Sequence, residues 1–279
     1  MDSVALVKHT GDVNASLEEG IGLIGGFGEL LSPVIVKPNI CTNSDNTGYS
    51  VTRVEVVESL IQLVLHEDER ISIRIVESDS ESKFAMDAFD QFGYNDLCDN
   101  MQSEGHDVSL VNLSSPPLVE VELNGQYFEK LEIHEILTKP CYFVTIAAAK
   151  THYLTFITGA LKNQFGLLPK KGQSSYHRDI DDVIVDLNRF VKPDLCIVDG
   201  RVGVEGWNGP RTRPLNLFLI GRNPVSVDAT LTRIMGFKPQ MARHLMECGK
   251  IGLGTLNPEV LGESIESMAV GFDSPSKPS

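Results

Sequence analysis

Four predicted strands in the sequence are each followed by polar side chains at the same relative place. The runs 34–36, 73–76, 145–149 and 195–198 lead into a set of lysine, amide, histidine and carboxylate side chains: Lys37, Asn39, Glu77, Asp79, Lys150, His152 and Asp199. In an open parallel sheet the carboxyl ends of the strands share one edge, and ligands bind in the crevice outside it. One polar ending carries no information, but four favour a shared site at that edge.

A glycine-flanked segment adds two candidates for binding a substrate. Gly159, Lys162, Asn163 and Gly166 are spaced i, i+3, i+4 and i+7, so a helix places them on one face. Glycine costs about 1 kcal/mol against alanine inside a helix, which suggests that something approaches this face closely. Lys162 and Asn163, with Lys37 and Asn39, are therefore expected to bind an anionic substrate. The plainer alternative is a glycine-softened helix whose lysine extends to solvent.

Three carboxylates are candidates for holding a divalent cation. Asp199 and Glu205 flank a glycine-rich segment that reaches Pro210, where backbone N–H groups could also face a ligand. Carboxylate oxygens are the ligands that Mg²⁺ and similar cations prefer. Asp228 could complete such a site. Equally, it could stabilise the N-terminus of the helix that Asn223 and Pro224 begin.

Acid/base chemistry would fall to His152, His177 or Lys150. A histidine titrates near neutral pH and can carry a proton in either direction. His177 follows Tyr176 in a Gly/Ser-rich loop. Most loop histidines are simply exposed, so that reading of His177 stays open.

A literal GxGxxG match at Gly20, Gly22 and Gly25 does not predict a dinucleotide site. That fingerprint belongs in the tight turn directly after a strand. Here Ser16 and Glu19 form a capping-box pair that predicts a helix start before the glycines, running towards Leu31. We therefore expect close helix packing at the glycines and no NAD.

Composition limits the classes of partner. The 279 residues carry a net charge of −14, which disfavours nucleic acid and anionic lipid. The five cysteines lie singly, so the chain encodes no iron–sulfur cluster. The N-terminus does not read as a signal peptide, and no apolar run is long enough to span a bilayer. A cytoplasmic protein is expected.

Alternating strand and helix patterns predict an α/β fold, a mainly parallel sheet with helices on both faces. Val119, Val121, Leu131 and Ile133 flank an Asn124-Gly125 pair, which predicts a small antiparallel hairpin insertion around 117–133. A second capping box at Thr52 and Glu55 predicts a helix start. Residues 1–272 are expected to form one domain, and 273–279, rich in Ser, Pro and Lys, a disordered tail.

At these motifs the chain resembles the domain-of-unknown-function family DUF362 of bacteria and archaea. The resemblance runs from Lys37-Pro-Asn39 through 159–163 and Tyr176-His177 to Asp199-Gly200, Glu205-Gly206, Gly209-Pro210 and 224–229. Many members carry ferredoxin-like cysteine clusters, which this chain lacks. The resemblance therefore implies a polar site but no particular reaction.

The leading hypothesis is an enzyme that uses a divalent cation, held by Asp199 and Glu205, to act on a small anionic substrate. Lys37, Lys150 and Lys162 would bind that substrate, and His152 or His177 would move protons. The alternatives are a non-catalytic protein that binds a small anion or a metal, and an electron-transfer accessory protein that borrows clusters from a redox partner. The reaction class and the oligomeric state stay open.

Overall fold

A computed structural model describes residues 2–169 and 172–275 of the chain. Its main sheet has the strand order β11-β1-β10-β9-β7-β2-β3-β4, with β8 paired to β7. All neighbours on the path are parallel except that β10 runs antiparallel to both β1 and β9. The strands of this sheet are β1 (Ser3–Lys8), β2 (Val34–Pro38), β3 (Ile73–Glu77), β4 (Val108–Asn112), β7 (Tyr142–His152), β8 (Phe156–Thr158), β9 (Leu195–Glu205), β10 (Arg211–Gly221) and β11 (Glu259–Gly262).

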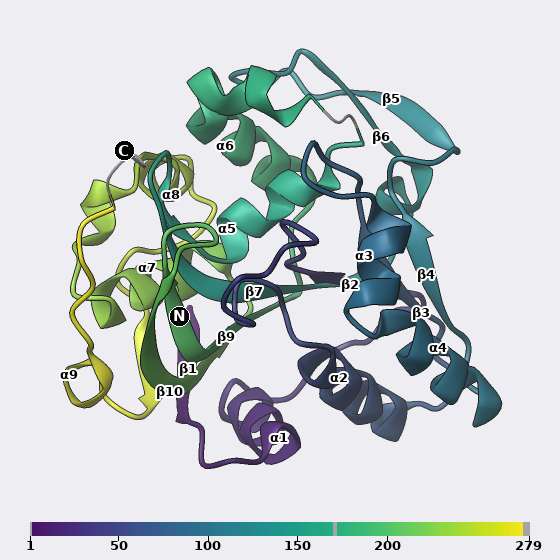
Figure 1. The fold of residues 1–279 in the computed structure, drawn as a ribbon, viewed down its shortest axis with the longest axis horizontal. Coiled ribbons are helices and arrows are strands. Elements are labelled where there is room, and N and C mark those ends of the chain that lie inside the picture. The colour runs from purple at the N-terminus through teal and green to yellow at the C-terminus, as the bar shows by residue number, and fades with distance from the viewer. Residues whose placement is uncertain (1, 170–171, 276–279) are drawn as a thin grey trace.

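Helices cover both faces of the sheet, as the sequence predicts. In Figure 1, α1 and α2 lie below the central strands, and α5 and α6 lie above them. The helices are α1 (Val13–Leu23), α2 (Val54–Glu67), α3 (Ala85–Gln91), α4 (Tyr94–Ser103), α5 (Ala160–Asn163), α6 (Ile180–Phe190), α7 (Pro224–Ile234), α8 (Arg243–Lys250) and α9 (Ile265–Met268).

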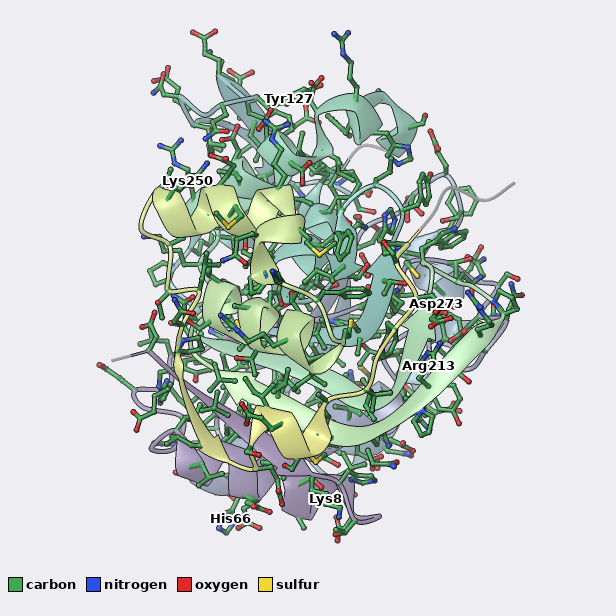
Figure 2. All side chains as sticks on the ribbon, turned by 90° about the vertical axis from the view of Figure 1, so that its left-hand side faces the viewer. Lys8, His66, Tyr127, Arg213, Lys250 and Asp273 are labelled. Carbon is green, nitrogen blue, oxygen red and sulfur yellow. The ribbon has the colours of Figure 1, made fainter. Side chains whose placement is uncertain are left out.

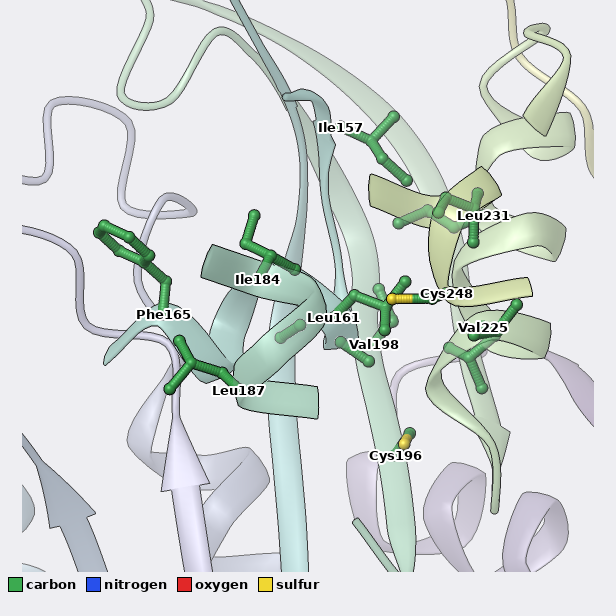
Figure 3. Packing of buried hydrophobic residues seen from close by; sticks show 14 of the residues in the cluster. Ile157, Leu161, Phe165, Ile184, Leu187, Cys196, Val198, Val225, Leu231 and Cys248 are labelled. Carbon is green, nitrogen blue, oxygen red and sulfur yellow. The ribbon is translucent and has the colours of Figure 1, made fainter. Parts of the chain in front are cut away.

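The two helical layers pack on two separate apolar cores. Successive strand residues alternate between them: Ile35 joins the core of α5–α8, whereas Val34 and Val36 join the core of α1–α4. Figure 3 shows Leu161 of α5 and Val198 of β9 pointing toward one another, with Cys248 of α8 beside them. Strands buried on both faces need continuous apolar runs, and that is the pattern that the sequence provides.

The predicted hairpin is present as β5 (Leu118–Glu122) and β6 (Lys130–His134), an antiparallel pair separate from the main sheet. Its loop is held by Asp186 of α6, whose buried carboxylate accepts the backbone N–H groups of residues 126, 127 and 128 at 2.8–2.9 Å. Gly125 makes this approach possible, because a Cβ atom there would lie 2.2 Å from Oδ2 of Asp186.

Both predicted capping boxes are wrong, although the helices exist. Helix α1 begins earlier, at Val13, where Asp12 accepts the N–H of Ala15, and it ends at Leu23. The Ser16 hydroxyl instead donates to the Asp12 carbonyl. Helix α2 has no side-chain cap, because the Thr52 hydroxyl donates across to the carbonyl of Ile146 in β7.

Gly20 and Gly22 lie within α1, and Gly25 follows its end with φ +85°. A Cβ atom at Gly20 would lie 2.2 Å from the Ile220 side chain of β10. Gly20 therefore serves helix packing, as the sequence predicts. Apart from adjacent residues and the helix's own backbone, no described atom lies within 4 Å of a Cβ atom at Gly22 or Gly25, so the packing prediction is wrong at those two positions.

The C-terminal segment closes over the ends of β9 and β10. Asp273 forms ion pairs with Arg211 at 2.9 Å and with Arg213 at 3.6 Å. Figure 2 shows Asp273 and Arg213 lying close together. Phe272 is buried against Gly203 and Leu215. The predicted disordered tail thus begins with a residue that the structure places in contacts, and residues 276–279 lie outside the described part.

Candidate functional site

The chain reverses its direction across the sheet between β2 and β7. From β2 it proceeds through α2 to β3, whereas from β7 it proceeds through α5 and α6 to β9 on the other side. The two connections cover opposite faces and leave a crevice outside the carboxyl ends of β2 and β7. A cavity of about 290 Å³ lies there.

The cavity is lined by the strand-end residues and by the loops and helices that follow them. Five of the seven strand-end candidates are among these residues: Lys37, Asn39, Glu77, Lys150 and His152. The others are Ile40, Cys41, Ser80, Glu81, Ser82, Lys83, Tyr153, Thr158, Lys162, Asn163, Phe165, Gly166, His177, Ile180 and Trp207. The described lining thus carries four lysines against two glutamates, in a chain whose net charge is −14.

One glutamate, Glu77 at the end of β3, is shared between two of the lysines. Its Oε2 accepts Lys37 Nζ at 2.8 Å, and its Oε1 lies 3.5 Å from Lys83 Nζ. Burial lowers the pKa of Lys37, and the Glu77 carboxylate partly offsets this effect. Gly166 leaves room for the pair, since a Cβ atom there would lie 2.8 Å from Lys37 Nζ. The Lys37–Glu77–Lys83 cluster is therefore a structural part of the cavity wall.

Lys150 is buried at the end of β7 without a carboxylate partner among the described residues. Its ammonium donates to the Ser50 carbonyl at 2.7 Å and to the Cys41 sulfur at 3.3 Å. Both partners lie in the loop that follows β2. The described partners of the Lys150 ammonium are therefore dipoles and not a counter-ion, and Lys150 contributes to the lining of the cavity.

Lys162 is the least satisfied cation of the cavity. It lies on α5, partly exposed, with Nζ 5.7 Å from the centroid of the Phe165 ring. Among residues 2–169 and 172–275 it has no carboxylate within 4.0 Å and donates no hydrogen bond. Burial, together with the nearby Lys150 charge, lowers the pKa of Lys162 to about 8. A positive charge here lacks the counter-ion that such burial ordinarily requires.

Asp228 holds α5 in position. From α7 its carboxylate accepts the N–H groups of Ala160 and Leu161 at 2.7 and 3.0 Å. Gly159 is needed because a Cβ atom there would lie 2.2 Å from Asp228 Oδ1. Burial raises the pKa of Asp228 to about 7, although the two N–H groups favour the carboxylate. The residue caps a helix, but of α5 and not of its own helix.

His152 and His177 face the cavity from different environments. His152 is buried, and burial, with the charges of Lys162 and Lys150, lowers its pKa well below the usual value. Its Nδ1 accepts the N–H of Leu154 at 3.1 Å, so the proton of the neutral ring is on Nε2. His177 is exposed on the 3-10 helix Gln173–Asp179.

The two predicted amide ligands line the cavity, but their side chains already bind the backbone. Asn39 Nδ2 donates to the Ser50 carbonyl at 2.8 Å. Asn163 Nδ2 donates to the Lys37 carbonyl at 3.0 Å and to the Thr145 hydroxyl at 2.8 Å. Both residues therefore position β2 and the loop after it.

The predicted metal ligands do not converge at the cavity. Asp199 faces α2 and pairs with Arg201 at 2.7 Å, and Glu205 pairs with Arg211 and Arg213 at 2.9 and 2.6 Å. The segment between them is not a glycine loop, because β9 continues through it to Glu205. In the part of the chain that the structure describes, no group of three His, Cys, Asp or Glu side chains could hold a metal ion.

Asp79, the remaining strand-end candidate, accepts the N–H of Ala85 at the start of α3, at 2.8 Å, and does not line the cavity.

Sequence reasoning missed Cys41, Lys83 and Trp207. Cys41 lies two residues beyond Asn39, and Trp207, the one tryptophan of the chain, lies in the turn between β9 and β10. That turn is tied to the loop after β2 by an amide clamp, formed by Asn46 and Asn208: the Asn46 N–H donates to Asn208 Oδ1 at 3.1 Å, and Asn208 donates to the Ser44 carbonyl. Pairing between such distant segments leaves no signal in the local sequence.

The protein is thus an α/β protein whose sheet is covered by helices on both faces. A lysine-rich cavity lies at the point where the strand order reverses. The chain belongs to the family described as Domain of unknown function (DUF362), whose profile matches residues 34–233. That range contains every cavity residue named above. The chain is also 24% identical, over 281 residues, to the thylakoid-associated protein sll1697 of Synechocystis sp., covering 92% of this chain and 82% of that protein. No helix in the described residues is long and apolar enough to cross a membrane.

Proposed function

We propose that the cavity binds a small organic anion. The observation that carries the proposal is Lys162, an ammonium in the cavity lining without a counter-ion among the described residues, close enough to Lys150 for the two charges to interact. Two neighbouring ammonium groups repel each other, and a bound carboxylate or phosphate would relieve that repulsion. Lys150 and Lys162 are the groups that contact the anion.

The charge of the whole molecule supports a small ligand over a polymer. A chain of net charge −14 repels a polyanion over a distance of about 8 Å at physiological salt, whereas a small anion inside the cavity is governed by the nearest lysines. A volume of about 290 Å³ lies just below the usual range for small-molecule sites, which begins at about 300 Å³, so it fits only a small ligand.

An enzymatic role is the finer part of the proposal. Burial holds His152 neutral, and its Nε2–H, which donates to no described residue, can serve a ligand oxygen. The cavity also contains Lys150 and the exposed His177. A divalent cation stays a prediction; Asp199, Glu205 and Asp228 lie outside the cavity, so such a cation would arrive with the anion. The redox partner and the cytoplasmic location also stay predictions.

Substituting Lys162→Met tests the proposal. The probes are lactate, succinate and inorganic phosphate, each titrated calorimetrically into the full chain. Loss of a hydrogen bond to a charged group costs about 1.5–3 kcal/mol, so affinity for the best probe should fall by about 10- to 150-fold. Lys8→Met, at an exposed position at the end of β1, is the matched control and should bind as the wild type does.

Equal affinity in Lys162→Met and the wild type would remove Lys162 from the site, and no binding of any probe to the wild type would refute anion binding. Native mass spectrometry of freshly purified protein would identify a co-purifying anion. Conversion of that anion on incubation would separate an enzyme from a binding protein.

A further inference from the structure

We propose that Lys162 forms an imine with the carbonyl carbon of a small carboxylic acid that also carries a ketone or aldehyde group. This inference rests on the proposed function, since the carboxylate is the anion that the cavity binds. It names the substrate class and gives the two neighbouring lysines different tasks.

The first argument is geometric. Of the four cavity lysines, three have their ammonium groups in use: Lys37 and Lys83 are held by Glu77, and Lys150 by Ser50 and Cys41. Within the described residues Lys162 alone of the four has no hydrogen bond or ion pair. Its nitrogen can approach a carbonyl carbon without first losing a protein partner.

The second argument is chemical. A lysine attacks a carbonyl group only as the neutral amine, and lysines that do so are desolvated or lie next to another cation. Lys162 meets both conditions, because burial and Lys150 lower its pKa to about 8. At pH 8 about half of the Lys162 side chains are neutral, more than about a hundred times the neutral fraction of an ordinary lysine.

The neighbours of Lys162 divide the remaining work. Lys150, whose ammonium donates to the Ser50 carbonyl, holds the carboxylate of the substrate. His152 presents Nε2–H as a donor to the carbonyl oxygen, as its Nδ1 is occupied by the Leu154 N–H. Phe165, 5.7 Å from Lys162 Nζ, excludes water from one side of the amine.

The step balances without an oxidant or a reductant. The nitrogen lone pair forms the N–C bond as the C=O π pair moves onto oxygen. One proton passes from nitrogen to that oxygen, and a second comes from solvent. The oxygen then leaves as water, and the iminium nitrogen keeps one hydrogen and the positive charge.

The test is reductive trapping. The full chain is incubated with pyruvate, 2-oxoglutarate or glyoxylate and sodium cyanoborohydride at pH 8, and the adducts are located by peptide mass spectrometry. At least one acid should label Lys162 at least about tenfold faster than the exposed Lys8, because of its larger neutral fraction. Lactate, which lacks the carbonyl group, should slow the labelling by competition.

Lys162→Arg is the matched variant, because arginine keeps the positive charge but forms no such imine. It should lose the adduct at this position, whereas the control Lys8→Met should keep it. If none of the three acids labels Lys162 preferentially, the imine proposal is wrong. Lactate or phosphate binding measured on the same wild-type sample then shows whether anion binding stands without it.

Discussion

Lys162 has an electrostatic cost that should be visible in the pH dependence of stability. Its folded-state pKa is about 8, below the ordinary 10.5. Unfolding therefore takes up a proton between about pH 8 and 10.5, and the wild type gains stability as pH rises through that window. Below pH 8 Lys162 is charged in both the folded and the unfolded state, so the full cost of burying its charge lowers the free energy of unfolding.

We expect Lys162→Met to be more stable than the wild type at pH 7, by about 1–3 kcal/mol after allowance for partial exposure. The difference should shrink from pH 8 towards 10.5, as followed by urea denaturation at each pH. Lys8→Met should show no such trend. A difference independent of pH would mean that Lys162 is fully solvated.

The residue spacing pointed to Lys162, but the structure gives the flanking glycines a different role from the one expected. The flanking glycines at 159 and 166 were expected to let a ligand approach. They instead make room for Asp228 and for the Lys37–Glu77 pair. The sequence could show that close approach occurs at this face, but not that the approaching groups belong to the protein, because those partners lie on other elements.

At the scale of elements, α1 offers a controlled comparison between two of its glycines. Gly20 faces β10, where a Cβ atom would lie 2.2 Å from Ile220. At Gly22, no described atom outside the helix's own backbone lies within 4 Å of a Cβ atom. Gly20→Ala should lower the free energy of unfolding by about 1–3 kcal/mol, because the core must shift to admit the methyl group. Gly22→Ala should raise it by up to about 1 kcal/mol. Urea denaturation of both variants checks this, and equal effects would contradict the close packing of α1 on the sheet.

Strand positions were predictable and helix starts were less so. Runs such as 34–36 and 195–198 are apolar on both faces, which a buried parallel strand requires. Capping was mispredicted at Ser16 and Thr52 because their hydroxyls have other acceptors, including one 94 residues away at Ile146. Only the hydrogen bond that a side chain finally makes decides whether it caps.

At the scale of the whole molecule, the C-terminal segment stabilises β9 and β10 from outside. Phe272 is 8% exposed and packs on Gly203, whereas Phe84 is 63% exposed. Phe272→Ala should cost about 2–4 kcal/mol by leaving a cavity, and Phe84→Ala, the matched control, less than about 0.5 kcal/mol. Thermal and urea melts of the two variants test this, and similar small effects would show that the segment contributes little.

The metal prediction assumed that β9 ends at Asp199. The strand continues six residues further to Glu205 and pairs with β10 along that length, so its carboxylates meet Arg201, Arg211 and Arg213. Glycines at 200 and 203 suggested a loop, but they accommodate Leu217 and Phe272. The end of a strand depends on its neighbour in the sheet, which the local sequence does not contain.

The amide clamp between Asn46 and Asn208 joins two walls of the cavity that lie 162 residues apart in the chain. The walls that carry Cys41 and Trp207 are thus already fixed to each other, so a bound ligand would cost the protein little conformational entropy. Such a preformed site binds a ligand of matching shape more tightly than a larger one, because its walls are held together. Substituting either asparagine would weaken this connection and leave the cavity lysines unchanged.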